Sequence, residues 1–416
     1  MNALKQLFGG DTRQFGMIFA LVALILFFQF RTGGRTLTSG NVINLINGNA
    51  YILVLAIGMV LVIIAGHIDL SVGSIAAFVG IAVAIAMRDW HLPWWLAIVF
   101  GLVLGAVIGA WQGFWVAYVG IPAFIVTLAG MMLFRGLNQF VGKSNTVPVP
   151  EDFQVIGAGY LPEVGPVTGY NNLTLLLGLG AVLFFILSSR RARIKNRTLG
   201  AVVAPLWVDV TKVTLISAAV LYATYLFATG RPGTSIPISG LILLVLVLIY
   251  GFISTRTILG RHVYAVGGNK HAAELSGVRS KKVNFLVMMN MSILAALAGM
   301  MFVARSTASG PFDGVMWELD AIAAVFIGGA AVSGGVGTVM GSIIGGLVMA
   351  VLNNGLQLLG VGADATQIIK GLVLLAAVAF DVYNKTQGKP SITGLLMRSF
   401  NKPSTPAPPT PEKISV

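Results

Sequence analysis

The chain has 416 residues, of which 56% are hydrophobic and 10% are charged, and its mean hydropathy is +0.88. Soluble domains carry roughly 25% charged residues, so this composition excludes a water-soluble enzyme. The apolar residues come in blocks of roughly 16 to 25, the length that a helix needs to cross a bilayer. With no cysteine, the chain forms no disulfide, thiolate nucleophile or Cys-based metal site. The sequence therefore predicts an all-α, polytopic membrane protein.

Twelve apolar blocks follow one another along the chain, and we interpret each as a membrane-spanning helix. The predicted bounds are 16–30, 50–66, 72–87, 94–118, 121–140, 172–189, 213–228, 236–254, 283–304, 321–335, 338–353 and 366–383. Twelve spans of about 20 residues take roughly 240 residues, which leaves no loop long enough for a catalytic domain. We predict one transmembrane domain over 1–400. A disordered tail is expected at 401–416, because residues 402–416 are rich in Pro, Ser and Thr.

The net charge of +13 is distributed unevenly over the predicted loops. If the N-terminus is cytoplasmic, the inside loops hold 19 of the 27 Lys and Arg residues. The outside segments hold the acidic residues Glu151, Asp152, Glu163, Asp313, Glu318 and Asp320. Cytoplasmic loops of membrane proteins carry this excess of cations, so we predict that both termini are cytoplasmic, with 141–171 outside and 190–212 inside. The cations occur in short loops between spans, so we expect lipid and no nucleic acid as a partner.

Glycine recurs at every fourth position in two of the predicted spans. The first series is Gly101, Gly105, Gly109 and Gly113, and the second is Gly337, Gly341 and Gly345. Such spacing removes side chains from one stripe of a helix, so that another backbone can approach closely. We interpret both series as helix-packing surfaces. The approaching helix can belong to the same subunit or to a second copy, and the sequence leaves both alternatives open.

Two polar, glycine-rich segments interrupt the apolar blocks. AGHIDLSVGS at 65–74 places His67, Asp69 and Ser71 between two spans, and GGAAVSGGVG at 328–337 contains Ser333. Ionisable groups at membrane depth usually face a cavity or a protein interior, so these residues are candidates for a pathway or gate. Alternatively, Asp69 or Ser71 only caps the helix that follows. Interrupted segments at corresponding positions of two halves also indicate an inverted repeat, which we predict here.

The charged loop predicted at 255–282 contains a short helix outside the membrane. In NKHAAELSG at 269–277, Asn269 is a candidate N-cap and Gly277 a candidate helix stop. A helix of about two turns is unstable by itself and needs a surface to dock on. From the residues alone, that surface is either the rest of the same chain or a separate subunit.

The spacing of the reactive residues predicts no catalytic or metal site. The chain has 4 His, 14 acidic residues and no Cys, and these form no triad or cluster in the sequence. We therefore expect no cofactor, no metal and no enzymatic activity in this chain. If transport is active, its energy must come from another polypeptide or from an ion gradient.

Several segments together resemble the membrane permeases of bacterial ABC sugar importers of the ribose, xylose and multiple-monosaccharide type. They are AGHIDLSVGS (65–74), PAFIVTLAGMMLFRG (122–136), GRHVYAVGGNKHAAELSGV (260–278), ELDAIAAVFIGGAAVSGGVGTVMGSIIG (318–345), NNGLQLLGV (353–361) and IIKGLVLLAAVAFDV (368–382). The resemblance covers nearly all of the chain except the tail. The extra apolar pair around 190–212, added to a core of ten spans, makes the chain most similar to the xylose and multiple-monosaccharide permeases.

This resemblance implies an assembly and a role for the loop helix. Two permease copies would form the pathway for a monosaccharide such as xylose, a tandem ATPase would bind on the cytoplasmic side, and a periplasmic binding protein would deliver the sugar. The residues that match the family's ATPase-coupling segment are Asn269, Ala272, Ala273, Glu274, Leu275 and Gly277. The alternatives are an ABC permease for nucleosides or branched-chain amino acids, an ion-coupled sugar transporter and a passive channel.

Overall fold

The computed structural model describes residues 12–386 except 202, 204 and 232, so the tail predicted at 401–416 lies outside it. The helices before the first strand are α2 (Thr12–Arg31), α3 (Ser39–Ile64), α4 (Val72–Asp89), α5 (Trp94–Phe114), the π-helical turn η1 (Trp115–Val119) and α6 (Ala123–Val141). Strand β1 (Val147–Pro148) follows, then α7 (Glu151–Ala158), α8 (Asn172–Thr198), α9 (Leu206–Ala228), α10 (Ile238–Arg256), α11 (Ile258–Gly268), α12 (Lys270–Leu275) and α13 (Ser280–Ser306). Strand β2 (Ala308–Ser309), antiparallel to β1, precedes α14 (Trp317–Ile327), α15 (Val339–Leu358) and α16 (Ala363–Thr386).

The predicted all-α, multi-pass architecture is confirmed. Each of the twelve predicted blocks overlaps a helix, and among the described residues nine helices are long and apolar enough to cross a membrane. The span expected at 321–335 is wrong, because α14 ends at Ile327. Gly329 there adopts a φ of +82°, and the N–H of Ala330 donates back to the carbonyl of Val325, as in a glycine-terminated helix. Residues 328–338 consequently form a non-helical segment.

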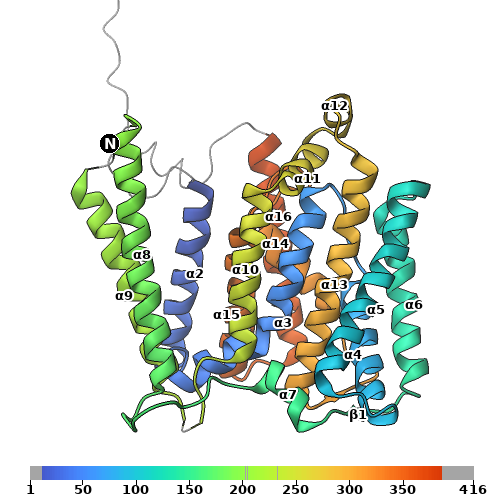
Figure 1. Cartoon of the computed structure of the whole chain (residues 1–416), viewed down its shortest axis with the longest axis horizontal. Helices are drawn as coiled ribbons and strands as arrows, with labels where there is room; N and C mark the ends of the chain where they lie inside the picture. Colours follow the sequence, from blue (N-terminus) through green and yellow to red (C-terminus); the bar gives the residue numbers. More distant parts are fainter. Residues whose placement is uncertain (1–11, 202, 204, 232, 387–416) are drawn as a thin grey trace, which may run out of the picture.

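The two ends of the bundle carry different loops (Figure 1). One end, here called the α12 face, carries α12 and the link between α8 and α9, and α2 begins and α16 ends toward it. The opposite end, here called the ribbon face, carries α7 and the β1–β2 ribbon. The predicted inside loops 190–212 and 255–282 therefore share one face, and the predicted outside loop 141–171 lies on the other.

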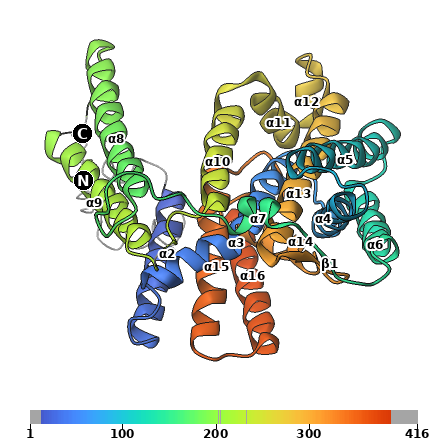
Figure 2. The ribbon, with the colours of Figure 1, turned by 60° about the horizontal axis from the view of Figure 1, so that its bottom comes forward.

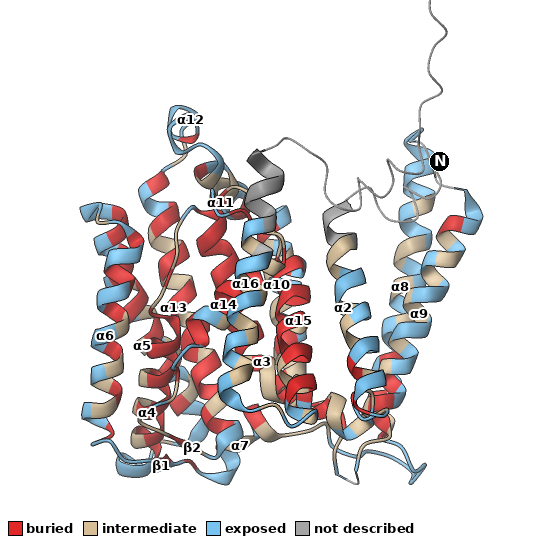
Figure 3. Ribbon diagram, turned by 180° about the vertical axis from the view of Figure 1, so that it is seen from behind, coloured by how far each residue is buried: buried red, intermediate tan, exposed pale blue. Residues whose placement is uncertain are grey.

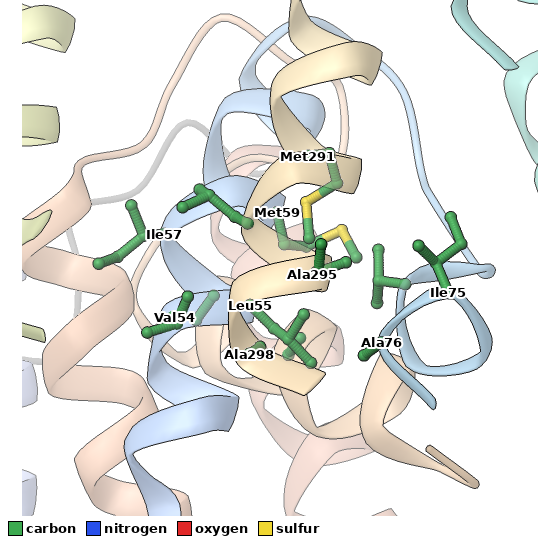
Figure 4. Packing of buried hydrophobic residues seen from close by; sticks show 14 of the residues in the cluster. Val54, Leu55, Ile57, Met59, Ile75, Ala76, Met291, Ala295 and Ala298 are labelled. Atoms are coloured by element: carbon green, nitrogen blue, oxygen red, sulfur yellow. The ribbon is translucent and has the colours of Figure 1, made fainter. Parts of the chain in front are cut away.

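The hydrophobic core lies where α3, α4 and α13 meet. Figure 4 shows side chains such as Leu55 of α3, Ile75 of α4 and Met291 of α13 in this region, and all three are fully buried. Glycine lets the backbones approach here, since a Cβ on Gly299 of α13 would lie 2.0 Å from the carbonyl oxygen of Ala76 in α4. Buried residues concentrate in these helices and in α14 and α15, whereas α8 and α9 are largely exposed (Figure 3).

The first glycine series packs within the subunit. On α5, Gly101, Gly105, Gly109 and Gly113 all face α13, and a Cβ on Gly109 would lie 2.7 Å from the Cα of Met289. Backbones this close leave no room for any side chain, which is the arrangement that small residues permit between membrane helices.

The second glycine series is helical only in part. Gly341 and Gly345 of α15 face Gly328 and Ala324, at the end of α14. The expectation that Gly337 belongs to the same stripe is wrong, because Gly337 has a φ of +156° and precedes the helix. Thr338 is the N-cap instead, and its hydroxyl oxygen accepts a hydrogen bond from the N–H of Gly341 at 2.9 Å.

Non-helical chain precedes a buried helix twice, at 65–71 before α4 and at 307–316 before α14. The starts of these helices meet inside the bundle, since a Cβ on Gly73 would lie 2.2 Å from the carbonyl oxygen of Gly314. Helix N-termini carry partial positive charge, so the positive ends of α4 and α14 lie close together inside the bundle. The predicted inverted repeat stays a prediction, and this pair of breaks is a second candidate for its corresponding positions.

The extra apolar pair, α8 and α9, forms a hairpin beside the bundle. The two helices pack on each other, and α9 reaches the core helices through α3, where the hydroxyls of Ser39 and Thr229 lie 2.7 Å apart. Figures 1 and 2 both show the hairpin standing apart from the other helices. Its apolar surface is therefore available to lipid along most of its length.

Candidate functional site

The predicted loop helix exists as α12 and is capped as its sequence predicts. The side-chain oxygen of Asn269 accepts a hydrogen bond from the N–H of Ala272 at 3.0 Å. At the other end, Gly277 adopts a φ of +85°, which lets the chain turn away into α13. Figure 1 shows α12 as the outermost element of its face.

The candidate coupling residues differ in how far they are exposed. Leu275 is 79% exposed, and Ala272 is exposed too. Glu274 is exposed, and its carboxylate accepts a hydrogen bond from the hydroxyl of Ser280 at the start of α13. Ala273 is only 6% exposed, because its side chain lies on the side of α12 that faces the rest of the subunit. Among the predicted coupling residues, Ala273 therefore has almost no surface left for docking, since its side chain is already buried within its own subunit.

Behind α12, three backbone segments meet at glycines. The N–H of Gly335 donates to the carbonyl of Ile64 at 2.8 Å, which joins the second interrupted segment to the end of α3. Gly267, near the end of α11, has no room for a side chain, because its Cβ would lie 1.6 Å from the same Ile64 oxygen. The hydroxyl of Tyr264, also on α11, donates to the carbonyl of Gly337 at 2.7 Å. We call this contact the glycine junction.

Asp69 and Ser71 lie deeper, at the start of α4. Oδ1 of Asp69 accepts hydrogen bonds from the N–H of Ser71 at 2.8 Å and from its hydroxyl at 2.6 Å, while Oδ2 has no partner. The Ser71 oxygen accepts from the side-chain amide of Gln112 on α5 at 2.8 Å. All three side chains are fully buried. Asp69 thus holds the turn into α4, whereas the Ser71 side chain caps no helical N–H.

His67 and Ser333 lie near the glycine junction. His67 lines an open pocket of about 470 Å³ beside α12, with Lys270, Lys281 and Asn284. Its Nε2 and the Asn284 Oδ1 have no hydrogen-bond partner. Ser333 is exposed and precedes Gly334, which packs against Gly66. The structure therefore brings the two interrupted segments together but keeps Ser333 away from the buried Asp69–Ser71 pair.

Sequence reasoning missed two ion pairs inside the bundle. Arg135 of α6 lies 3.6 Å from Glu318, and Lys370 of α16 lies 2.5 Å from Asp320, both acids being on α14. The placement of Glu318 and Asp320 in an outside segment is wrong, because α14 is flanked by α3 and α15. The available signal was the presence of Arg135 and Lys370 within apolar blocks, where charges seldom occur without a partner.

Among the residues that the structure describes, no group of three or more His, Asp or Glu side chains could hold a metal ion. The structure instead has apolar helices long enough to span a bilayer, charged pairs between helices of the bundle, and a short capped helix that projects from one face. Charged side chains within membrane-spanning helices commonly mark the pathway of a solute or ion. The fold and these sites define a polytopic membrane permease.

Comparison with known proteins gives the family. The model for the "branched-chain amino acid transport system / permease component" family matches residues 41–378. The xylose transport system permease protein XylH of Haemophilus influenzae is 41% identical over 370 residues, covering 89% of this chain and 96% of that protein. XylH of Escherichia coli K12 is 40% identical over 388 residues, covering 92% and 94%. This chain belongs to that permease family.

A more distant relative is the ribose import permease protein RbsC of Haemophilus influenzae, 31% identical over 347 residues, which cover 83% of this chain and 86% of that protein. No solved structure matches the chain.

Proposed function

We propose that this chain is the membrane-spanning permease subunit of an ABC importer that carries a monosaccharide, xylose or a related pentose or hexose, across the bacterial inner membrane. The observation that carries the proposal is the 40–41% identity to two xylose transport permeases over nearly the whole chain. The hairpin of α8 and α9 lies within this similarity, which covers 92% of the chain in one case. The chain hydrolyses no ATP itself and takes its energy from a partner.

The proposed assembly has two copies of this chain. An ATPase subunit binds on the α12 face, and a periplasmic sugar-binding protein binds on the ribbon face. The family resemblance indicates that the ATPase is a tandem one. The excess of Lys and Arg in 190–212 and 255–282 supports a cytoplasmic α12 face, because cytoplasmic loops carry such cations. Both termini are then cytoplasmic.

The glycine junction supports a route for coupling. In the proposed assembly α12 docks on the ATPase, and α11 follows its movement because Asn269 alone separates the two helices. Gly267 of α11 touches the Ile64 oxygen, and Gly335 donates to it, without intervening side chains. Packed backbones transmit displacement as rigid bodies, so a shift of α12 reaches both interrupted segments at once.

Reconstitution tests this function. The chain is placed in liposomes with its ATPase and binding-protein partners, and uptake of radiolabelled xylose, ribose, leucine and a nucleoside is measured with ATP inside or outside. We expect xylose uptake that needs ATP on the α12 side and the binding protein on the other. Uptake driven by a proton or sodium gradient without the ATPase would overturn the proposal in favour of secondary transport, and uptake of leucine alone would change the cargo.

A further inference from the structure

A small cavity lies between α14, α15 and α16, at the Lys370–Asp320 ion pair. Its volume is about 120 Å³. The polar groups that line it are Asp320, Gln367 and Lys370, and the apolar ones include Met316, Leu319 and Leu374. The lining of this cavity is thus partly polar and partly apolar. It includes no residue of α12 and does not include Asp69.

The cavity lies at the depth of the hydrocarbon. Met349, halfway along the 20 residues of α15, lines the same cavity, so Asp320 and Lys370 lie near the middle of that span. Both charged side chains remain 19% exposed, and Gln367 is exposed. Lipid hydrocarbon offers no hydrogen bonds to such groups, so polar residues at this depth face protein or water. Asp320, Lys370 and Gln367 consequently face protein or a water-filled space rather than lipid.

We propose that this cavity is a station on the sugar pathway, in which Asp320, Lys370 and Gln367 contact the hydroxyl groups of the monosaccharide in transit. The inference rests on the proposed function and adds the contact residues to it. A carboxylate accepts hydrogen bonds from sugar hydroxyls, while an ammonium group and an amide donate to them. Met316 and Leu319 offer an apolar surface to the C–H groups of the ring.

The absence of cysteine makes a direct test of water access possible. Gln367→Cys places a thiol in the cavity, and Leu372→Cys places one at a 61% exposed, apolar position on the same helix. A charged, membrane-impermeant methanethiosulfonate reacts with thiolates, which form in water and not in hydrocarbon. In the assembled transporter we expect modification of Gln367→Cys at least about tenfold faster than that of Leu372→Cys, and slower modification when xylose, binding protein and ATP are present. Equal rates for the two variants in every state would overturn the proposal.

Transport kinetics provide the second measurement. Gln367→Leu removes one hydroxyl partner but keeps a similar side-chain volume at an exposed position, so assembly should be unaffected. We expect the xylose concentration for half-maximal uptake, or the maximal uptake rate, to change by at least about fivefold while copurification with the ATPase stays normal. Ile368→Ala, one residue away and outside the cavity lining, is the matched control and should transport as the wild type does.

Different outcomes would refute the proposed function and the proposed station. If the unmodified chain carries no monosaccharide in the reconstituted system, the proposed function is wrong. If it carries xylose, and Gln367→Cys reacts no faster than Leu372→Cys while Gln367→Leu transports normally, this inference is wrong. Asp320→Asn and Lys370→Met are informative only when the variant protein assembles, which is why the test begins with the exposed Gln367.

Discussion

A single carboxylate, that of Asp69, holds the non-helical segment 65–71 to the start of α4. Its Oδ1 accepts two hydrogen bonds from Ser71, and its Oδ2 has none. A buried N–H that loses its acceptor costs about 1–3 kcal/mol, so this contact matters for the fold whatever else Asp69 does. The two interpretations, a structural turn and a charged gate, make opposite predictions for a neutral side chain of the same shape.

We predict that Asp69→Asn assembles and still transports, because the asparagine oxygen can accept both bonds from Ser71 as the carboxylate does. The measurements are the yield of the folded complex and the rate of sugar uptake. Asp69→Ala is the control, and it should lose about 1–3 kcal/mol of stability because the Ser71 N–H is left without an acceptor. An Asp69→Asn variant that assembles normally but does not transport would contradict the structural interpretation.

Close packing of α5 on α13 depends on individual glycines. We predict that Gly109→Leu lowers the midpoint of thermal unfolding in detergent and the yield of protein, since its Cβ would lie 2.7 Å from the Met289 Cα. Overpacking of this kind costs typically about 1–3 kcal/mol, and here backbone rather than a flexible side chain must move. Gly180→Leu on the exposed hairpin helix α8 has nothing within 4 Å and should behave as the wild type. Equal unfolding midpoints for the two variants would show that α5 and α13 can separate without loss of stability.

At the scale of elements, α12 presents one large exposed apolar side chain, that of Leu275, from a capped helix of six residues. Leu275 is 79% exposed and Ala273 is 6% exposed, so the two positions separate docking from folding. Buried apolar anchors carry most of the energy of a typical interface, while the contacts around them contribute little.

We predict that Leu275→Arg leaves the fold intact and weakens binding of the ATPase by at least about tenfold, because it replaces an exposed apolar anchor by a charge. The measurements are copurification of the ATPase and sugar-stimulated ATP hydrolysis. Ala273→Arg is the contrasting variant, since it forces a long charged side chain into a buried position and should reduce the stability of α12 itself. Full copurification and full transport by Leu275→Arg would exclude α12 as the docking element, and 190–212 would then be examined first.

At the scale of the whole molecule, the two faces of the bundle carry loops of different charge. Glu163 is exposed in the loop between α7 and α8, and Lys195 is exposed in the last turn of α8. The two ends of α8 lie on opposite faces of the bundle (Figure 1). The excess of cations predicts that the α12 face is cytoplasmic.

We therefore expect Glu163→Cys to react with an impermeant thiol reagent in intact spheroplasts, and Lys195→Cys to react only after the membrane is opened. The chain has no other cysteine, so the labelling needs no background correction. Labelling of Lys195→Cys alone in intact spheroplasts would reverse the orientation of the entire bundle and move the proposed ATPase to the ribbon face.

Local signals sufficed for some parts of the site. Asn269 and Gly277 were recognisable as a cap and a stop because both act on their own backbone within a few residues. The burial of Ala273 was not recognisable, since it depends on how α12 folds back toward α13. The same holds for Gly337, which has helical spacing in the sequence but lies in a loop that contacts Ile64.

The sequence by itself determined that this is a polytopic all-α membrane protein, which loops share a side, and where the helix outside the membrane begins. Each of these follows from composition or from short-range spacing, because the bilayer imposes helix length and polarity on every span separately. Only the tertiary structure decided that α14 is a half-length helix, that Asp320 pairs with Lys370, and that Ile64, Gly267 and Gly335 meet. These contacts join residues far apart in the chain, and no local pattern encodes which of many apolar helices will be neighbours.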